Sequence, residues 1–187
     1  MRLFGLAFGK PHVDYTPLAV ARAYVFTGFF ALLAVVRACW PGMASEFLLP
    51  TGVVFAFILL NSFFSVRLFS SLTARGDYVQ WSFDALLVAL YALMVVSLGD
   101  PILFPAWTAA MFLAATAKYA VLSLRHHELR LLFRHKMLVD LLGFWFAALA
   151  GLWSVAGEPD VALHLWAIVF SLAQLDLFIR KPLYVAR

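Results

Sequence analysis

Six ionisable side chains interrupt the apolar stretches of this sequence, and they are the residues whose types could support chemistry. Three are cations and three are acids: Arg22, Arg67, Lys118, Asp84, Asp140 and Asp176. In apolar surroundings a carboxylate is held ionised by a nearby cation, and it can take up a proton when that cation leaves. The pattern therefore points to ion pairing inside the protein or to proton transfer.

These two uses have different consequences for the fold. Ion pairs would select which helices become neighbours, because a lone buried charge is far less favourable than a buried pair. Arg67 lies near the end of its apolar stretch, so its guanidinium could also reach the interface alone. Proton transfer would instead need a gated polar path, for which Asp140, Asp84 and Lys118 are the candidates. Both interpretations remain open from the sequence.

Two further sets of residues accompany the charges. Uncharged polar side chains could extend a polar path, or could simply form hydrogen bonds between helices. This set comprises Asn61, His164, Ser171 and Gln174. Small residues continue the helical face of Asp140, which favours close helix packing of the small-xxx-small kind. They are Gly143, Ala147, Gly151 and Ser154.

The sequence contains no recognisable catalytic motif. We find no glycine-rich phosphate loop, no H-E-x-x-H, no G-x-S-x-G and no paired cysteines, since Cys39 is the one cysteine. His126, His127 and His135 are close in sequence, but their spacing does not force their rings to converge on a metal. We therefore expect no enzyme activity, no cofactor and no metal site.

The elements that must position these residues are membrane-spanning helices. Hydrophobic residues make up 65% of the chain and charged residues 13%, and the mean hydropathy is +0.93. Such a composition requires lipid as the main solvent. Because a span needs about 20 apolar residues, we predict six helices, at about Pro17–Ala38, Phe47–Ser70, Val79–Leu98, Ile102–Leu124, Met137–Ala156 and Val161–Ile179.

These spans predict an all-α polytopic membrane bundle made of three consecutive hairpins. The hairpins cover about 17–70, 79–124 and 137–179 within one domain, 17–187, and residues 1–16 precede it as an interfacial segment. A proline in the outer turn of each hairpin supports a weak threefold repeat. Arg22 precedes Pro41 by 19 residues, Asp84 precedes Pro101 by 17, and Asp140 precedes Pro159 by 19.

Basic residues predict the orientation. They are concentrated in the two terminal segments and in the loops that lie on the same side of the membrane as the termini. Because basic loops stay in the cytoplasm, we expect both termini there. We expect the membrane to be a plasma membrane, the inner membrane of a bacterium. The net charge of +4 follows from this bias and does not indicate nucleic acid. Contacts with anionic lipid headgroups or a partner are expected from Arg125, Arg130, Arg134, Lys136, Arg180 and Lys181.

The arrangement of three hairpins resembles two families, the HdeD-like acid-resistance membrane proteins and the urea and amide channels. The resemblance covers architecture and length only, and it assigns no residue. Two functional hypotheses follow. The first is a non-catalytic subunit or scaffold, which assembles as a homo-oligomer or with other membrane subunits through ion pairs and small-residue faces. The alternative is a small channel or proton-coupled transporter with a polar path through Asp140, Asp84 and Lys118.

Overall fold

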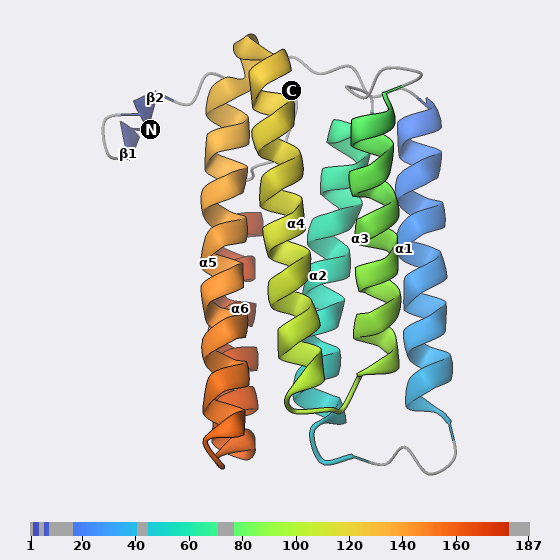
Figure 1. Ribbon diagram of the computed structural model, residues 1–187, viewed down its shortest axis with the longest axis vertical. Helices are drawn as coiled ribbons and strands as arrows, with labels where there is room; N and C mark the ends of the chain where they lie inside the picture. Colours follow the sequence, from blue (N-terminus) through green and yellow to red (C-terminus); the bar gives the residue numbers. More distant parts are fainter. Residues whose placement is uncertain (1, 4–5, 8–16, 41–44, 71–76, 180–187) are drawn as a thin grey trace.

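The predicted six-helix architecture is confirmed by a computed structural model, which describes residues 2–3, 6–7, 17–40, 45–70 and 77–179 (Figure 1). Six helices are long and apolar enough to cross a membrane, so the protein is an integral, multi-pass membrane protein in contact with lipid. Their bounds are α1 Pro17–Ala38, α2 Leu48–Phe69, α3 Tyr78–Val96, α4 Leu103–Arg125, α5 Arg130–Val155 and α6 Pro159–Ile179.

Three short elements complete the described secondary structure. Strands β1 (Arg2–Leu3) and β2 (Leu6–Ala7) pair antiparallel within the segment predicted to be interfacial. Most of that segment lies outside the described residues. A 3-10 turn, η1 (His127–Leu129), joins α4 to α5. Because α5 follows this turn directly, it begins seven residues before the predicted start at Met137.

The six helices form a closed ring. Each helix contacts two neighbours in the order α1, α2, α6, α5, α4, α3, and α3 contacts α1 again. Figure 1 shows α5, α4 and α3 in front, with α6 and α2 behind them. The hairpins meet through different helices, α1 with α3, α4 with α5 and α2 with α6. The threefold sequence pattern therefore does not produce equivalent contacts between the hairpins.

The ring is packed differently at its two ends. We call the end where α1, α3 and α5 begin the inner end, at the top of Figure 1, and the opposite end the outer end. The outer half is filled by large buried side chains that come from α2, α3, α4 and α6. They include Val54, Phe55, Met94, Val95, Phe104, Leu163 and Trp166.

Hydrogen bonds between hairpins hold the outer end together. The turn after α3 contains Gly99, whose φ of 83° favours glycine. Its backbone N–H donates to Thr51 Oγ1 at 3.1 Å, and Ser45 Oγ donates to its carbonyl oxygen at 2.8 Å. The guanidinium of Arg37 donates to the carbonyl of Val96 from both Nε and Nη2. The first two hairpins are therefore fixed to each other at this end.

The small residues of α5 face α4 inside the bundle. Ala147 is fully buried, and a Cβ built on Gly151 would lie 3.4 Å from Pro105 Cβ. A Cβ built on Gly143 would lie 2.7 Å from Cζ of Phe112, which is too close for an unshifted ring. Gly143 therefore allows α4 and α5 to approach closely. This face is used within the chain, so it is not exposed to a partner.

We predict that Gly143→Ala destabilises the protein by about 1–3 kcal/mol, because the added methyl group would displace the buried Phe112 ring. Thermal unfolding in detergent measures the effect. Gly28→Ala is the matched control, since a Cβ on this helical glycine meets nothing within 4 Å. The control should be neutral or stabilise by up to about 1 kcal/mol. Equal melting temperatures for the two variants would contradict the close α4–α5 contact.

Candidate functional site: a charged cavity in the inner half

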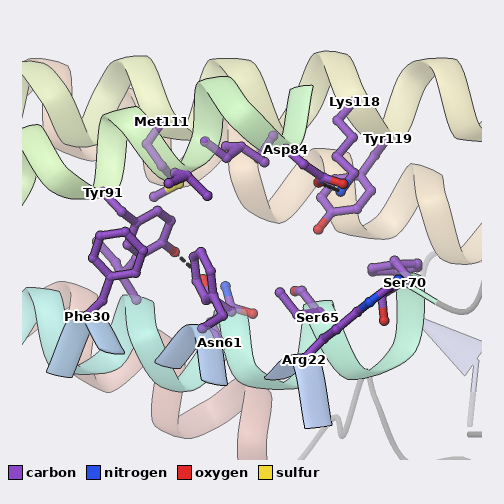
Figure 2. Close-up of a pocket in the computed structure, with 18 of the residues that line it drawn as sticks. Arg22, Phe30, Asn61, Ser65, Ser70, Asp84, Tyr91, Met111, Lys118 and Tyr119 are labelled. Carbon is purple, nitrogen blue, oxygen red and sulfur yellow. Dashed lines mark hydrogen bonds and ion pairs between the residues drawn. The ribbon is translucent and has the colours of Figure 1, made fainter. Parts of the chain in front are cut away.

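The inner half of the ring contains a cavity of about 710 Å³, which is lined by helices α1 to α5 (Figure 2). Its level follows from the helix bounds, because Arg22, Asp84 and Lys118 lie five, six and seven residues from the inner ends of α1, α3 and α4. Five charged residues contribute to the lining: Arg22, Asp84, Lys118, Lys136 and Asp140. The cavity is therefore the place where most of the intramembrane charge converges.

The most buried charges in the lining form an ion pair within α5. Lys136 Nζ contacts Asp140 Oδ1, and their side chains are 4% and 1% exposed. Residues four apart lie on the same helix face, so the sequence separation alone aligns them. Lys136 Nζ also lies 5.4 Å from the centre of the Tyr119 ring. Both charges are thus compensated although neither reaches the protein surface.

This position differs from the one that we predicted for Lys136. The sequence placed Lys136 in a basic linker, in contact with lipid headgroups. The structure begins α5 at Arg130, so Lys136 lies almost two turns inside the helix and faces the cavity. Leu129, Phe133 and Lys136 are buried while Arg130 and Arg134 are exposed. The segment is therefore an amphipathic helix whose buried face includes the lysine.

A second ion pair joins two helices at the edge of the cavity. Lys118 of α4 contacts Asp84 of α3, so the two charges of the second hairpin pair with each other. The Lys118 side chain is 12% exposed, whereas the Asp84 side chain is 49% exposed. Figure 2 shows both side chains meeting above the cavity. This pair therefore lies between the buried interior and the surface of the bundle.

Arg22 is the third cation of the lining. It is exposed, and among the described residues no ion-pair partner is found for it. In Figure 2 its side chain extends from α1 toward Ser70 of α2. The Oγ atom of Ser70 is buried and has no hydrogen-bond partner among the described residues. The remote oxygen of Asp140, Oδ2, is likewise buried without a partner there.

Uncharged polar groups complete the inner part of the cavity. Asn61 and Ser65 of α2 are buried and belong to the lining. Ser62 forms a hydrogen bond with the hydroxyl group of Tyr91, at the aromatic end of the cavity. Figure 2 shows this aromatic end, with Phe30 and Tyr91, opposite the end with Lys118 and Tyr119. The cavity is thus apolar at one end and charged at the other.

Two members of the predicted charge layer lie outside the cavity lining. The guanidinium carbon of Arg67 lies 5.5 Å from the ring centre of Phe64 and 6.0 Å from that of Phe63. These distances allow cation–π contacts on the α2 surface. Asp176 is half-buried on α6. The predicted layer of six charges therefore separates into four that line the cavity and two that do not.

The predicted uncharged polar path is mostly absent from the lining. Only Asn61 of its four residues lines the cavity. His164 is exposed near the outer end of α6, where its Nδ1 lies 2.9 Å from the carbonyl oxygen of Asp160. Ser171 and Gln174 contribute buried polar atoms to the interior but do not line the cavity. Helix α6 contributes none of its described residues to the lining, so its polar side chains do not form part of this cavity.

The exposed basic residues lie at the inner end of the bundle. Arg125 of α4 pairs with Asp77, whose carboxylate accepts from the backbone N–H of Gln80 at the start of α3. Arg130 and Arg134 are exposed on the first turns of α5. Arg180 and Lys181 lie outside the described residues. The described arginines are therefore placed where headgroup contacts can occur.

The cavity opens sideways between α1 and α3. Its lining includes exposed apolar residues on both helices, among them Val25 and Phe29 of α1 and Trp81 and Val88 of α3. At its other end the filled outer half of the bundle closes it. A molecule that enters from the bilayer would therefore pass apolar rims first and then meet the charged end.

Several residues of the site were missed by the sequence analysis. Nothing in the sequence distinguishes Tyr119 and Ser70, because aromatic and serine residues are frequent throughout the spans. The role of Lys136 could have been predicted, since Lys136 and Asp140 have the four-residue spacing of a helical ion pair. No group of three or more His, Cys, Asp or Glu that could hold a metal ion occurs in the described part of the chain.

Comparison with protein families, with curated proteins and with solved structures finds no match to this chain. The architectural resemblance to HdeD-like proteins and to urea and amide channels therefore gains no support from a matching relative.

The buried pair predicts strongly non-additive mutations. Lys136→Met should destabilise the protein by about 3–5 kcal/mol, because it leaves the Asp140 carboxylate buried without its cation. Lys136→Met combined with Asp140→Leu should recover most of this loss, since no uncompensated charge remains. Thermal unfolding in detergent measures both variants.

Arg125→Met is the control for the variants at positions 136 and 140. It removes a cation from a more exposed pair, so it should change the unfolding free energy by no more than about 1 kcal/mol. A double variant, Lys136→Met with Asp140→Leu, that is less stable than Lys136→Met alone would show that the two side chains are not paired.

Proposed function

We propose that this protein is a small, non-catalytic membrane transporter of the carrier type, which binds its ligand in the inner cavity. One observation carries the proposal: Asp84, Lys118 and Asp140 come from three different helices and line the same cavity. Convergent charged groups in a largely apolar concave site are typical of a ligand-binding site. In membrane spans they typically mark substrate or ion pathways.

The packing of the bundle favours a carrier over an open channel. A channel needs a continuous polar path, but the outer half is occupied by large apolar side chains such as Phe55, Met94 and Phe104. The exposed residues of the cavity lining belong to the inner and middle parts of α1 and α3, and none of the described residues of the outer end lines it. One-sided access to a central site is the arrangement from which alternating access proceeds in secondary transporters.

The basic residues support an orientation for this site. We propose that the protein lies in a plasma membrane, the inner membrane of a bacterium, with both termini in the cytoplasm. The exposed Arg125, Arg130 and Arg134 at the inner end support this assignment through the positive-inside rule. The cavity would then open toward the cytoplasmic leaflet.

The buried ion pair supports proton coupling in the carrier. Lys136 is the counter-ion that holds the Asp140 carboxylate ionised in the cavity. A change of access that separates the two side chains would leave Asp140 in apolar surroundings without its counter-ion, and a carboxylate in that position tends to take up a proton from water. We propose that this proton returns to water when the change of access is reversed and the pair forms again.

A subunit role is the second candidate, and it has one observation in its favour. The opening between α1 and α3 exposes Arg22 and Asp84 along the side of a membrane-spanning bundle. A transmembrane helix of another subunit, or of a second copy, would cover these charges. The small-residue face of α5 does not add to this candidate, because it packs against α4.

Cysteine accessibility tests the carrier proposal. In a Cys39→Ser background, Ser65→Cys should react with a membrane-impermeant maleimide applied from the inner side, because Ser65 lines the cavity. Labelling from the outer side should be at least tenfold slower but measurable, as alternating access requires. Labelling of inside-out and right-side-out vesicles, read by mass shift, gives both rates.

Ser154→Cys is the matched control, since Ser154 is buried to the same degree but belongs to the packed outer half. It should stay unreactive from both sides. An unreactive Ser65→Cys would contradict an accessible cavity. Reaction from the inner side alone, together with a stoichiometric foreign subunit after purification, would support the subunit candidate instead.

A further inference from the structure

We infer that the ligand of the inner cavity is a single-chain amphiphile whose head carries one negative charge and a hydrogen-bond donor, and that it enters sideways between α1 and α3. This inference rests on the proposed function, because it names the ligand class of the same site. The polarity, charge, unpartnered atoms, size and opening of the cavity each contribute a step.

The polarity of the cavity matches an amphiphile in its ordinary orientation. The aromatic end, with Phe30 and Tyr91, lies toward the middle of the bundle, and the end with Lys118 and Tyr119 lies toward the inner end (Figure 2). A lipid of the inner leaflet also presents its tail to the bilayer middle and its head to the inner side. It could therefore enter without turning over.

The charges of the lining select an anionic head. Three cations, Arg22, Lys118 and Lys136, face two carboxylates, Asp84 and Asp140, so three minus two leaves one positive charge. Both lysines already have carboxylate partners, whereas Arg22 has none among the described residues. A head with one negative charge would neutralise the site, and the guanidinium of Arg22 is suited to bidentate contact with a phosphate or carboxylate.

The unpartnered atoms select a head that also donates a hydrogen bond. Asp140 is fully buried and lines the cavity, yet its Oδ2 has no donor within the described residues. A buried acceptor without a partner is unfavourable by about 1–3 kcal/mol. A hydroxyl group on the ligand head would supply the donor. Ser70 Oγ, which is also unpartnered there, could donate to the charged group of the same head.

The size and opening of the cavity favour one chain. A volume of about 710 Å³ falls within the usual range of about 300–1,000 Å³ for sites that hold one small molecule. The rims are exposed and apolar, with Leu18 and Val25 on α1 and Val88 on α3. An acyl chain could lie along these rims and extend into lipid while the head occupies the charged end.

The test measures binding of defined probes to the purified full chain in phosphatidylcholine nanodiscs. Lysophosphatidylglycerol has one chain, one negative charge and head hydroxyls, whereas lysophosphatidylcholine has the same chain with a zwitterionic head. Native mass spectrometry or thermal stabilisation gives the affinities. Lysophosphatidylglycerol should bind at least tenfold more tightly than lysophosphatidylcholine. Lysophosphatidylmethanol, whose phosphodiester head has one negative charge and no head hydroxyl group, should bind more weakly than lysophosphatidylglycerol, and equal binding of these two would contradict the hydrogen-bond donor.

Two pairs of variants locate the binding. Arg22→Gln should weaken lysophosphatidylglycerol binding by about tenfold or more, whereas Arg130→Gln, which removes an exposed charge outside the cavity, should not. Ala21→Trp narrows the opening and should abolish binding, whereas Ala31→Trp on the same helix should not, since Ala31 is exposed but does not line the cavity.

The outcomes separate this inference from the proposed function. Equal binding of the two lysolipids, or binding that Arg22→Gln and Ala21→Trp leave unchanged, would overturn the ligand class even if Ser65→Cys is accessible from the inner side. An unreactive Ser65→Cys would overturn both. Selective binding that is lost in Arg22→Gln and Ala21→Trp, and kept in their controls, supports the inference.

Discussion

Neutralisation of charge inside the bilayer is the constraint on which this structure depends. Lipid offers no hydration to an ionised side chain, so each charge in the spans must find a partner, an aromatic face or a route to the interface. Lys136 and Asp140 solve the problem within α5, and Lys118 and Asp84 solve it between α4 and α3. Arg67 lies against the aromatic rings of Phe63 and Phe64.

This constraint also explains why a cavity lies in the inner half of the ring. In the outer half, apolar residues such as Val54 and Phe55 interdigitate, and Gly143 lets α4 approach α5. In the inner half, the charged groups keep the facing helices from filling the centre with apolar side chains. The remaining space has an aromatic end and a charged end, and it opens where α1 meets α3. Its shape and its chemistry thus have the same origin.

The fold could be predicted from the sequence because lipid requires long apolar helices, which leave a plain hydropathy signal. Ion pairing inside the bundle was one of the two uses that the sequence offered for the six charges, and Asp84 pairs with Lys118 because α3 and α4 are adjacent helices joined by a short turn. The ring order could not be predicted, since it depends on side-chain packing between distant helices, such as Gly143 against Phe112. Lys136 was placed wrongly because a short basic stretch has the same composition in a linker as in an amphipathic helix. Its neighbours Arg130 and Arg134 are exposed, as in a linker, but Lys136 lies on the buried face of α5. The sequence also predicted that α6 has a polar face, but it could not predict which helix lies next to that face.

The central claim is that paired charges in the inner half maintain a cavity that holds a ligand. An experimental structure of the protein in lipid nanodiscs, made from a native membrane extract, tests it most directly. The account predicts elongated density in the cavity, with its head beside Arg22 and Asp140 and its tail leaving between α1 and α3. A cavity filled by repacked side chains, or Lys136 and Asp140 turned apart toward lipid, would contradict it.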